Sequence, residues 1–186
     1  TAYLASLIAH GDLPPLRAAL LHSADRNRDY SVDSGYNRHL ATTLLPRLRA
    51  AHPATVAVGV GASLGALALL STQRRYPESL DGLFLQSGSF FHPDHDAHES
   101  GFRYYRRMVR WVQGVHRSTS HPRPVPVALT CGTVEENLAN NRRMADTLAA
   151  QGYDVTFTEN RDGHNYTAWR DALHPALTEL VAKVAR

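Results

Sequence analysis

The chain has 186 residues, of which 43% are hydrophobic, and its formal net charge at pH 7 is +3. This length allows one substantial core and gives no reason to expect a second, so we expect a single domain over residues 1–186. The basic residues, nearly all arginine, are scattered rather than grouped in a block, which argues against a nucleic-acid partner. The sequence also lacks an apolar run of the roughly 18 residues that a membrane span needs.

Cys131 is the only cysteine, so no internal disulfide can form. The N-terminal residues do not combine a basic segment with the long apolar run of an export signal. Disulfides are rare in reducing compartments, and the composition therefore favours a cytoplasmic protein. We expect no metal and no other cofactor, and a small-molecule partner.

Short apolar or β-branched runs alternate with longer segments of helical period along the chain. We expect helices at residues 1–10, 34–51, 63–76, 100–115, 137–151 and 166–186. We expect strands at residues 17–22, 56–60, 82–86, 126–130 and 154–159. This alternation predicts an α/β fold with a mostly parallel sheet and helices on both of its faces. Ligands of such sheets bind beyond the carboxyl ends of the strands.

A G-x-S-x-G motif, residues 61–65, lies between the second predicted strand and an Ala/Leu-rich helix. In this context Ser63 is a candidate nucleophile on a sharp strand-to-helix turn, which Gly61 and Gly65 allow to close. The backbone N–H of Leu64 can then donate to the oxyanion that forms during acyl transfer. The alternative is a glycine-rich turn in which Ser63 only caps the helix.

A serine hydroxyl needs a nearby base, and the chain contains 11 histidines. His164 follows the last predicted strand, and Gly163 before it allows a sharp loop. We therefore expect His164 to be the base, with a polar loop histidine as the alternative. Seven other histidines fall within or beside predicted elements, and we expect them to be surface or packing residues.

The carboxylate that orients this histidine is expected after the fourth predicted strand, where Glu135 and Glu136 are adjacent. We favour Glu135, with Glu136 as the alternative, because spacing cannot rank neighbouring residues in a turn. One of the two can instead contribute negative charge to the first turn of the next helix.

Two further clusters allow more than one interpretation. His92, His95 and His98 lie among acidic residues, and we expect a mobile, solvated loop there, although the side chains could also bind a metal. The arginines between residues 103 and 110 form a solvated helix face or a surface that attracts an anionic substrate.

The order of these pieces resembles the enterochelin esterase family, also called the esterase D-like group. The matching pieces are residues 3–4, 11–15, 26–30, 44–46, the turn at Ser63, Pro77, 86–90, 131–133, 141–142, 163–166 and 169–170. The resemblance implies an α/β-hydrolase fold and a catalytic set of Ser63, Glu135 and His164. It further implies a serine esterase that forms an acyl-serine intermediate on a catecholate siderophore ester such as enterobactin. Positive charge suits such an anionic iron complex, and the candidate binding residues are Arg26, Arg28, Arg106 and Arg107.

The sequence departs from this family in two places. Family members carry the first strands of the sheet and a second oxyanion donor ahead of the region that matches Thr1, so we expect an N-terminally incomplete catalytic domain. Loss of one such donor costs about 3 to 4 kcal/mol of transition-state stabilisation. Asp162 also replaces the usual second glycine before the histidine. The alternatives are therefore a non-catalytic ligand-binding member of the fold, or an esterase or acyltransferase for carbohydrate or thioester substrates.

Overall fold

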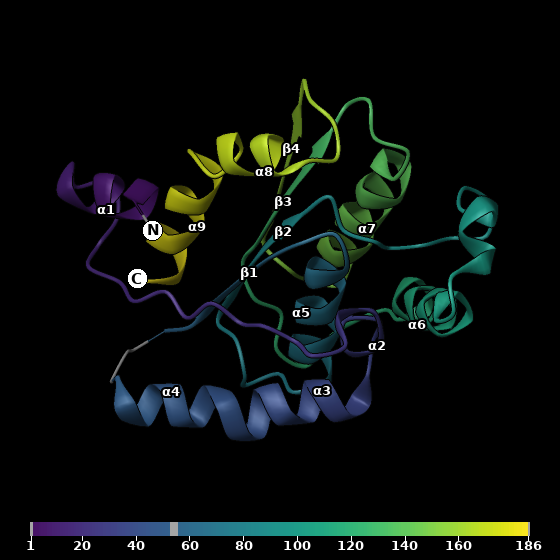
Figure 1. Ribbon diagram of the computed structural model, residues 1–186, viewed down its shortest axis with the longest axis horizontal. Coiled ribbons are helices and arrows are strands. Elements are labelled where there is room, and N and C mark those ends of the chain that lie inside the picture. Colours follow the sequence, from purple (N-terminus) through teal and green to yellow (C-terminus); the bar gives the residue numbers. More distant parts are fainter. Residues whose placement is uncertain (1, 53–55, 186) are drawn as a thin grey trace.

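A computed structural model describes residues 2–52 and 56–185, and a four-stranded parallel sheet forms its centre (Figure 1). The strands are β1 (Val58–Ala62), β2 (Gly82–Gln86), β3 (Val127–Gly132) and β4 (Val155–Asn160), and they lie in this order in space. Pairing is in register from Val58 opposite Gly82 to Gly132 opposite Asn160. Four of the five predicted strands are therefore present, within two residues of their predicted ends.

The helices before the third strand are α1 (Ala2–Ala9), α2 (Arg26–Asp29), α3 (Ser34–His39), α4 (Leu45–Ala51) and α5 (Leu64–Arg75). Later in the chain follow α6 (Tyr105–Arg117), α7 (Leu138–Ala150), α8 (Tyr166–Asp171) and α9 (Ala176–Val184). A π-helical segment, η1 (Leu40–Leu44), joins α3 to α4, and a 3-10 turn, η2 (Ala97–Gly101), precedes α6. No helix among the described residues combines the length and the apolar character that crossing a bilayer requires.

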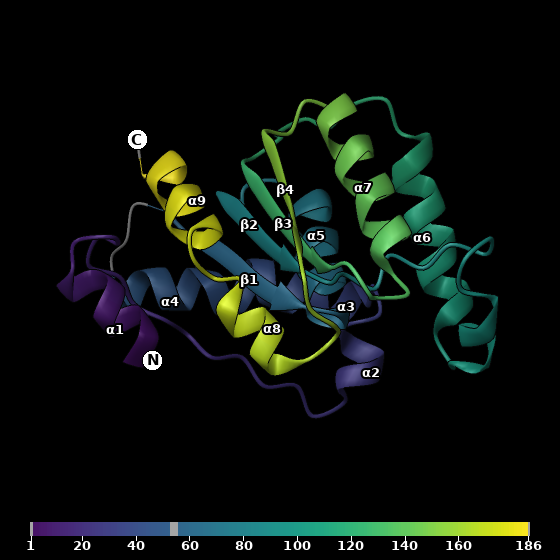
Figure 2. The same cartoon turned by 90° about the horizontal axis from the view of Figure 1, so that it is seen from above.

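Alternating side chains of the sheet build two separate cores. Leu83 and Leu85 of β2 belong to the larger core, which they share with residues of α5, α6 and α7. Phe84 between them belongs to the smaller core, with Leu177 and Leu180 of α9. Figures 1 and 2 show α9 on one side of the sheet and α5, α6 and α7 on the other. Helices cover both faces, as the sequence pattern predicts.

The predicted strand at residues 17–22 is wrong. This segment has no regular secondary structure, and the side chain of Leu20 is 86% exposed. Its apolar residues satisfy the composition of a strand, but a strand also needs a neighbouring strand to share backbone hydrogen bonds. None of the four strands of the described chain pairs with it.

Two predicted helices are interrupted at prolines. Residues 166–185 form α8 and α9 with a turn between them, because Pro175 has no N–H and disfavours a helical residue before it. Residues 34–51 form one helical stretch, which changes from α-helix to the wider π-helical turn η1 just before Pro46. In a regular α-helix the ring of a proline would clash with the carbonyl four residues earlier, and the wider turn avoids this clash. The outermost predicted residues, 1 and 186, lie outside the described part of the chain.

Candidate active site

Ser63 occupies the sharp turn between β1 and α5. Its backbone has φ 56° and ψ −123°, a left-handed conformation that is unfavourable for a side chain with a Cβ atom. The Ser63 N–H donates to the carbonyl of Gln86 at 2.9 Å, which fixes the turn to the end of β2. The serine therefore precedes the first turn of a 12-residue helix, at the carboxyl end of the sheet.

The two glycines of the motif have different surroundings. A Cβ atom on Gly61 would lie 2.7 Å from the backbone carbon of Gly65, so a small residue is required at position 61. Apart from its chain neighbours and the backbone of its own helix, a Cβ atom on Gly65 would meet no atom of the described residues within 4 Å. The prediction that both glycines let the turn close is correct for Gly61 and wrong for Gly65.

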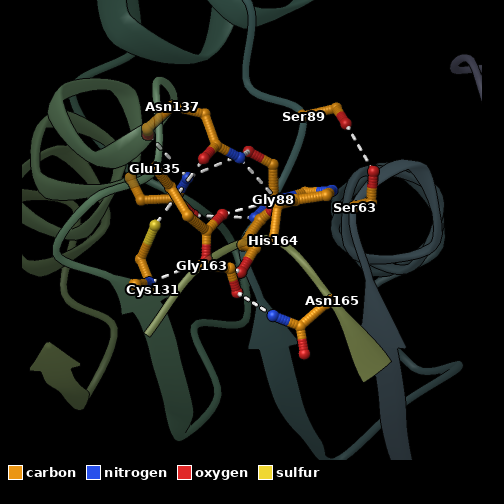
Figure 3. A network of polar contacts seen from close by, with 12 residues as sticks. Ser63, Gly88, Ser89, Cys131, Glu135, Asn137, Gly163, His164 and Asn165 are labelled. Carbon is orange, nitrogen blue, oxygen red and sulfur yellow. Dashed lines mark hydrogen bonds and ion pairs between the residues drawn. The ribbon is translucent and has the colours of Figure 1, made fainter. Parts of the chain in front are cut away.

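The hydroxyl of Ser63 has one hydrogen-bond partner, Ser89, among the described residues. The two Oγ atoms are 3.2 Å apart, and the Ser89 N–H donates to the Ser63 carbonyl at 3.2 Å (Figure 3). Ser63 makes no hydrogen bond with His164 in the described chain. His164 can take the Ser63 proton only after the two side chains come within hydrogen-bonding distance.

His164 and Glu135 form a partly buried pair at the same end of the sheet, in which the His164 side chain is 42% exposed. Nδ1 of His164 lies 2.7 Å from Oε2 of Glu135, whose side chain is 1% exposed. Figure 3 shows both residues in one view with Ser63. The Glu136 side chain is instead 81% exposed and pairs with His98 at 3.0 Å. The structure thus brings Glu135, not Glu136, to the histidine.

The Glu135 carboxylate is held by three donors. Its Oε1 accepts from the Ser87 hydroxyl at 2.7 Å and from the Gly132 N–H at 2.8 Å. Burial by itself raises the pKa of Glu135, but the hydrogen bonds from His164, Ser87 and Gly132 outweigh burial and leave that pKa below its usual value. Glu135 is therefore ionised at neutral pH and can stabilise a protonated imidazole.

The loop that carries His164 packs closely on the end of β3. A Cβ atom on Gly132 would collide with the backbone carbonyl of Asp162, so only glycine fits there. The Asp162 side chain accepts from the Gly163 N–H at 2.7 Å and from the Asn165 amide at 3.3 Å. These bonds close the loop with aspartate in place of the second glycine.

Leu64 is the first residue of α5, and its backbone N–H has no acceptor within the described chain. The N-terminus of a helix carries partial positive charge and unpaired N–H groups. The Leu64 N–H is therefore available to an acceptor from outside the described chain, and its role as an oxyanion donor stays a prediction.

Three residues near this site were not predicted from the sequence. Ser89 contacts Ser63 as described above. Ser87 donates to Glu135, and the indole N–H of Trp169 donates to Ser87 at 2.9 Å. The sequence offers one indication of Ser87 and Ser89, which directly follow a strand that ends beside the nucleophile.

Cys131, in the same region, does not compete as a nucleophile. It is 1% exposed, and burial and the nearby Glu135 carboxylate raise its pKa to about 12. The sulfur therefore remains a thiol at neutral pH.

The four candidate binding arginines lie on or beside α2 and α6. Arg28 pairs with Asp29 at 2.8 Å, and Arg26 stacks on Tyr30, with its guanidinium carbon 6.0 Å from the ring centre. Arg106 is exposed and has no hydrogen-bond partner among the described residues. Arg107 is different, because it ties α6 to the segment around α2.

The guanidinium of Arg107 donates to the carbonyls of Ser31 and Arg28, each at 2.6 Å. It also lies 3.4 Å from Asp33 and 4.6 Å from the ring centre of Tyr104. Arg107 is thus already occupied by protein groups, whereas Arg106 is free to meet an anion.

A hollow of about 750 Å³ lies between α5, α6 and the residues before α3, and Arg75, Arg107 and Arg110 are part of its lining. It does not include Ser63, Glu135 or His164. Arg75 ends α5, a helix of 12 residues that is about 18 Å long. This hollow therefore lies at the end of α5 that is remote from the candidate nucleophile.

The histidine-rich loop is partly buried, contrary to the solvated loop that we expected. His92 is 9% exposed, and its backbone N–H donates to the side-chain carboxylate of the buried Asp96 at 2.6 Å. His98 is half exposed and pairs with Glu136. In residues 2–52 and 56–185 no three histidine, cysteine or acidic side chains are arranged to hold a metal ion.

No protein-family model matches the sequence, and no curated protein matches it either. Solved structures do match. The enterobactin esterase of Shigella flexneri, crystallised with 2,3-dihydroxy-N-benzoyl-glycine, is 22% identical with a TM-score of 0.74, over 95% of this chain and 47% of that chain. The ferric enterobactin esterase of Salmonella typhimurium is 20% identical with a TM-score of 0.72, over 98% and 47%. A ferulic acid esterase is 15% identical with a TM-score of 0.72, over 98% and 76%.

The chain has an α/β-hydrolase fold. The overall arrangement of its parallel sheet and of the helices on both faces is similar to that of these esterases. At such low identity the similarity concerns the fold alone. The chain spans about half the length of the enterobactin esterases that it matches.

Proposed function

We propose that this chain is part of a serine esterase that cleaves carboxylic esters through an acyl-serine intermediate. The observation that carries the proposal is the buried Glu135 carboxylate bonded to His164, at the same end of the α/β-hydrolase sheet as the strained Ser63. Strained backbone at an exposed strand end is typical of functional sites. The esterases with the same fold support the assignment.

In the proposed reaction the Ser63 hydroxyl turns from Ser89, and its oxygen attacks the ester carbonyl while Nε2 of His164 takes the proton. Glu135 stabilises the imidazolium, and the Leu64 N–H donates to the oxyanion. The tetrahedral intermediate collapses, the alcohol leaves with the proton from His164, and Ser63 remains acylated. Water then gives a proton to His164 and attacks the acyl carbon, which releases the acid and restores Ser63.

Hydrolysis of p-nitrophenyl esters tests this function. Ser63→Ala and His164→Ala should abolish activity, whereas His39→Ala, at an exposed position of α3, should leave it unchanged. A fluorophosphonate probe should label Ser63 in the unmodified protein. An unlabelled Ser63, or variants as fast as the unmodified protein, would favour the non-catalytic ligand-binding alternative.

For the substrate we propose an anionic ester of the siderophore trilactone class, cut while it holds ferric iron as part of the substrate. The enterobactin esterases of the same fold and the free guanidinium of Arg106 support this choice. The second candidate substrate is a feruloyl ester. The ferulic acid esterase supports it, because the match covers a larger share of that enzyme than of the enterobactin esterases. Relative rates on ferric enterobactin and on a feruloyl sugar ester separate the two.

A further inference from the structure

A chain of hydrogen bonds leads from Trp169 in α8 to the catalytic carboxylate. The indole N–H of Trp169 donates to Oγ of Ser87 at 2.9 Å, and the Ser87 hydroxyl donates to Oε1 of Glu135 at 2.7 Å. Ser87 is 1% exposed and has a backbone φ of 48°, so its conformation is constrained. Water cannot readily replace the buried Ser87–Glu135 contact, whereas the Trp169–Ser87 contact is partly buried.

The direction of both bonds follows from the chemistry of the groups. An indole nitrogen only donates, an ionised carboxylate only accepts, and a hydroxyl has a single proton to give. With Trp169 as donor on one side, the Ser87 proton is directed to Glu135 on the other. Removal of the indole N–H leaves the Ser87 hydroxyl bonded to Glu135 but takes away the donor that holds the Ser87 oxygen from the other side.

Trp169 also contacts the other member of the pair. Its ring meets the imidazole of His164 edge to face, with ring centres 5.0 Å apart and an interplanar angle of 84°. Its carbonyl accepts from the Gln86 side chain at 2.7 Å, which fixes α8 to the end of β2. One residue therefore borders His164 directly and controls Glu135 through Ser87.

We infer that Trp169 and Ser87 are positioning residues that lock the Glu135–His164 pair in its working geometry. This inference rests on the proposed esterase function. Neither residue transfers a proton or bonds to the reacting atoms; both act through Glu135 and His164. Small displacements of catalytic groups are costly because proton transfer requires close alignment.

The test compares Ser87→Gly with Ser87→Ala. Glycine adopts a positive φ without strain, whereas alanine keeps the strain, but both lack the hydroxyl. Both variants should lower kcat on a p-nitrophenyl ester by about tenfold, with KM within about twofold of the unmodified protein. If Ser87→Gly keeps the full kcat, Ser87 has only a structural role and the inference is wrong.

Trp169→Phe removes the N–H and keeps an aromatic ring beside His164. It should lower kcat to a similar extent, and the double variant with Ser87→Gly should be no slower than the slower single variant, because both changes break one path. Trp111→Phe in α6, outside this chain of bonds, serves as the control and should leave kcat unchanged. Multiplying effects in the double variant would overturn the shared path.

A measurement that does not depend on turnover separates this inference from the esterase proposal. The Nδ1 proton of His164 should give a protected downfield NMR resonance in the unmodified protein, and exchange should accelerate in Ser87→Gly and Trp169→Phe but not in Trp111→Phe. Unchanged protection contradicts the inference. An inactive, unlabelled Ser63 together with the expected NMR changes instead contradicts the esterase function alone.

Discussion

Nδ1 of His164 lies 2.7 Å from Oε2 of Glu135, while the adjacent Glu136 points to His98 on a different loop. Two carboxylates that are neighbours in sequence thus have separate environments. One is nearly inaccessible and bonded to the candidate base, and the other is 81% exposed. The tight turn after β3 produces this division, because successive side chains there point in different directions.

The first prediction follows from this division. Glu135→Gln keeps the shape of the side chain but removes the charge that stabilises protonated His164, so kcat for a p-nitrophenyl ester should fall by about tenfold or more. Glu136→Gln removes only an exposed pairing with His98, and the rate should stay within about twofold. Steady-state kinetics of the two variants decides the assignment, and equal losses would contradict it.

The second prediction concerns the two glycines of the turn. Gly61→Ala places a Cβ atom against the Gly65 backbone, which cannot move without opening the turn, so both activity and the midpoint of thermal unfolding should fall. Gly65→Ala meets open space within α5 and should raise helix stability by up to about 1 kcal/mol. Thermal unfolding and probe labelling of Ser63 measure both effects. A stable, fully active Gly61→Ala protein would contradict the packing argument.

Features that depend on local pattern could be predicted from the sequence. The strand at residues 82–86 is fully buried, so its apolar run and its boundaries coincide with the observed β2. Ser63, Glu135 and His164 could be selected because each follows a predicted strand, and the ends of parallel strands lie at one edge of the sheet.

Features that depend on tertiary contacts could not be predicted. The segment 17–22 has the composition of a strand but no strand beside it. Ser87 and Trp169 are 82 positions apart, and nothing in either local sequence indicates that they share a hydrogen bond. The sequence shows Pro175, which disfavours a continuous helix. The helical spacing of the leucines around it nevertheless predicts one helix over residues 166–186.

The third prediction concerns stability at acid pH. Burial, together with the charge of Arg143 and the nearby His92, lowers the pKa of His116 to about 4 from an ordinary 6.5. Between these two values the unfolded chain binds a proton that folded His116 does not, so the folded state loses stability as the pH falls from 6.5 towards 4. The free energy of unfolding of His116→Gln should fall less steeply over this interval than that of the unmodified protein. Parallel curves from urea titrations at several pH values would contradict the assignment.

The last prediction separates two neighbouring arginines that sequence alone treats as equivalent. Arg107 donates to two backbone carbonyls and pairs with Asp33, so Arg107→Glu should lower the free energy of unfolding by about 2 kcal/mol or more and should affect every substrate alike. Arg106 is exposed and free of such contacts, so Arg106→Glu should change stability by less than about 0.5 kcal/mol.

If the charge of Arg106 attracts an anionic ester, Arg106→Glu should raise KM for ferric enterobactin at low salt and leave KM for a neutral aryl ester unaffected. The difference should vanish at 1 M salt, because the Debye length falls from about 10 Å at 0.1 M to about 3 Å. If KM for ferric enterobactin changes neither with salt nor in Arg106→Glu, Arg106 belongs to a solvated helix face. The residues of α6 then give no support to the proposal of an anionic substrate.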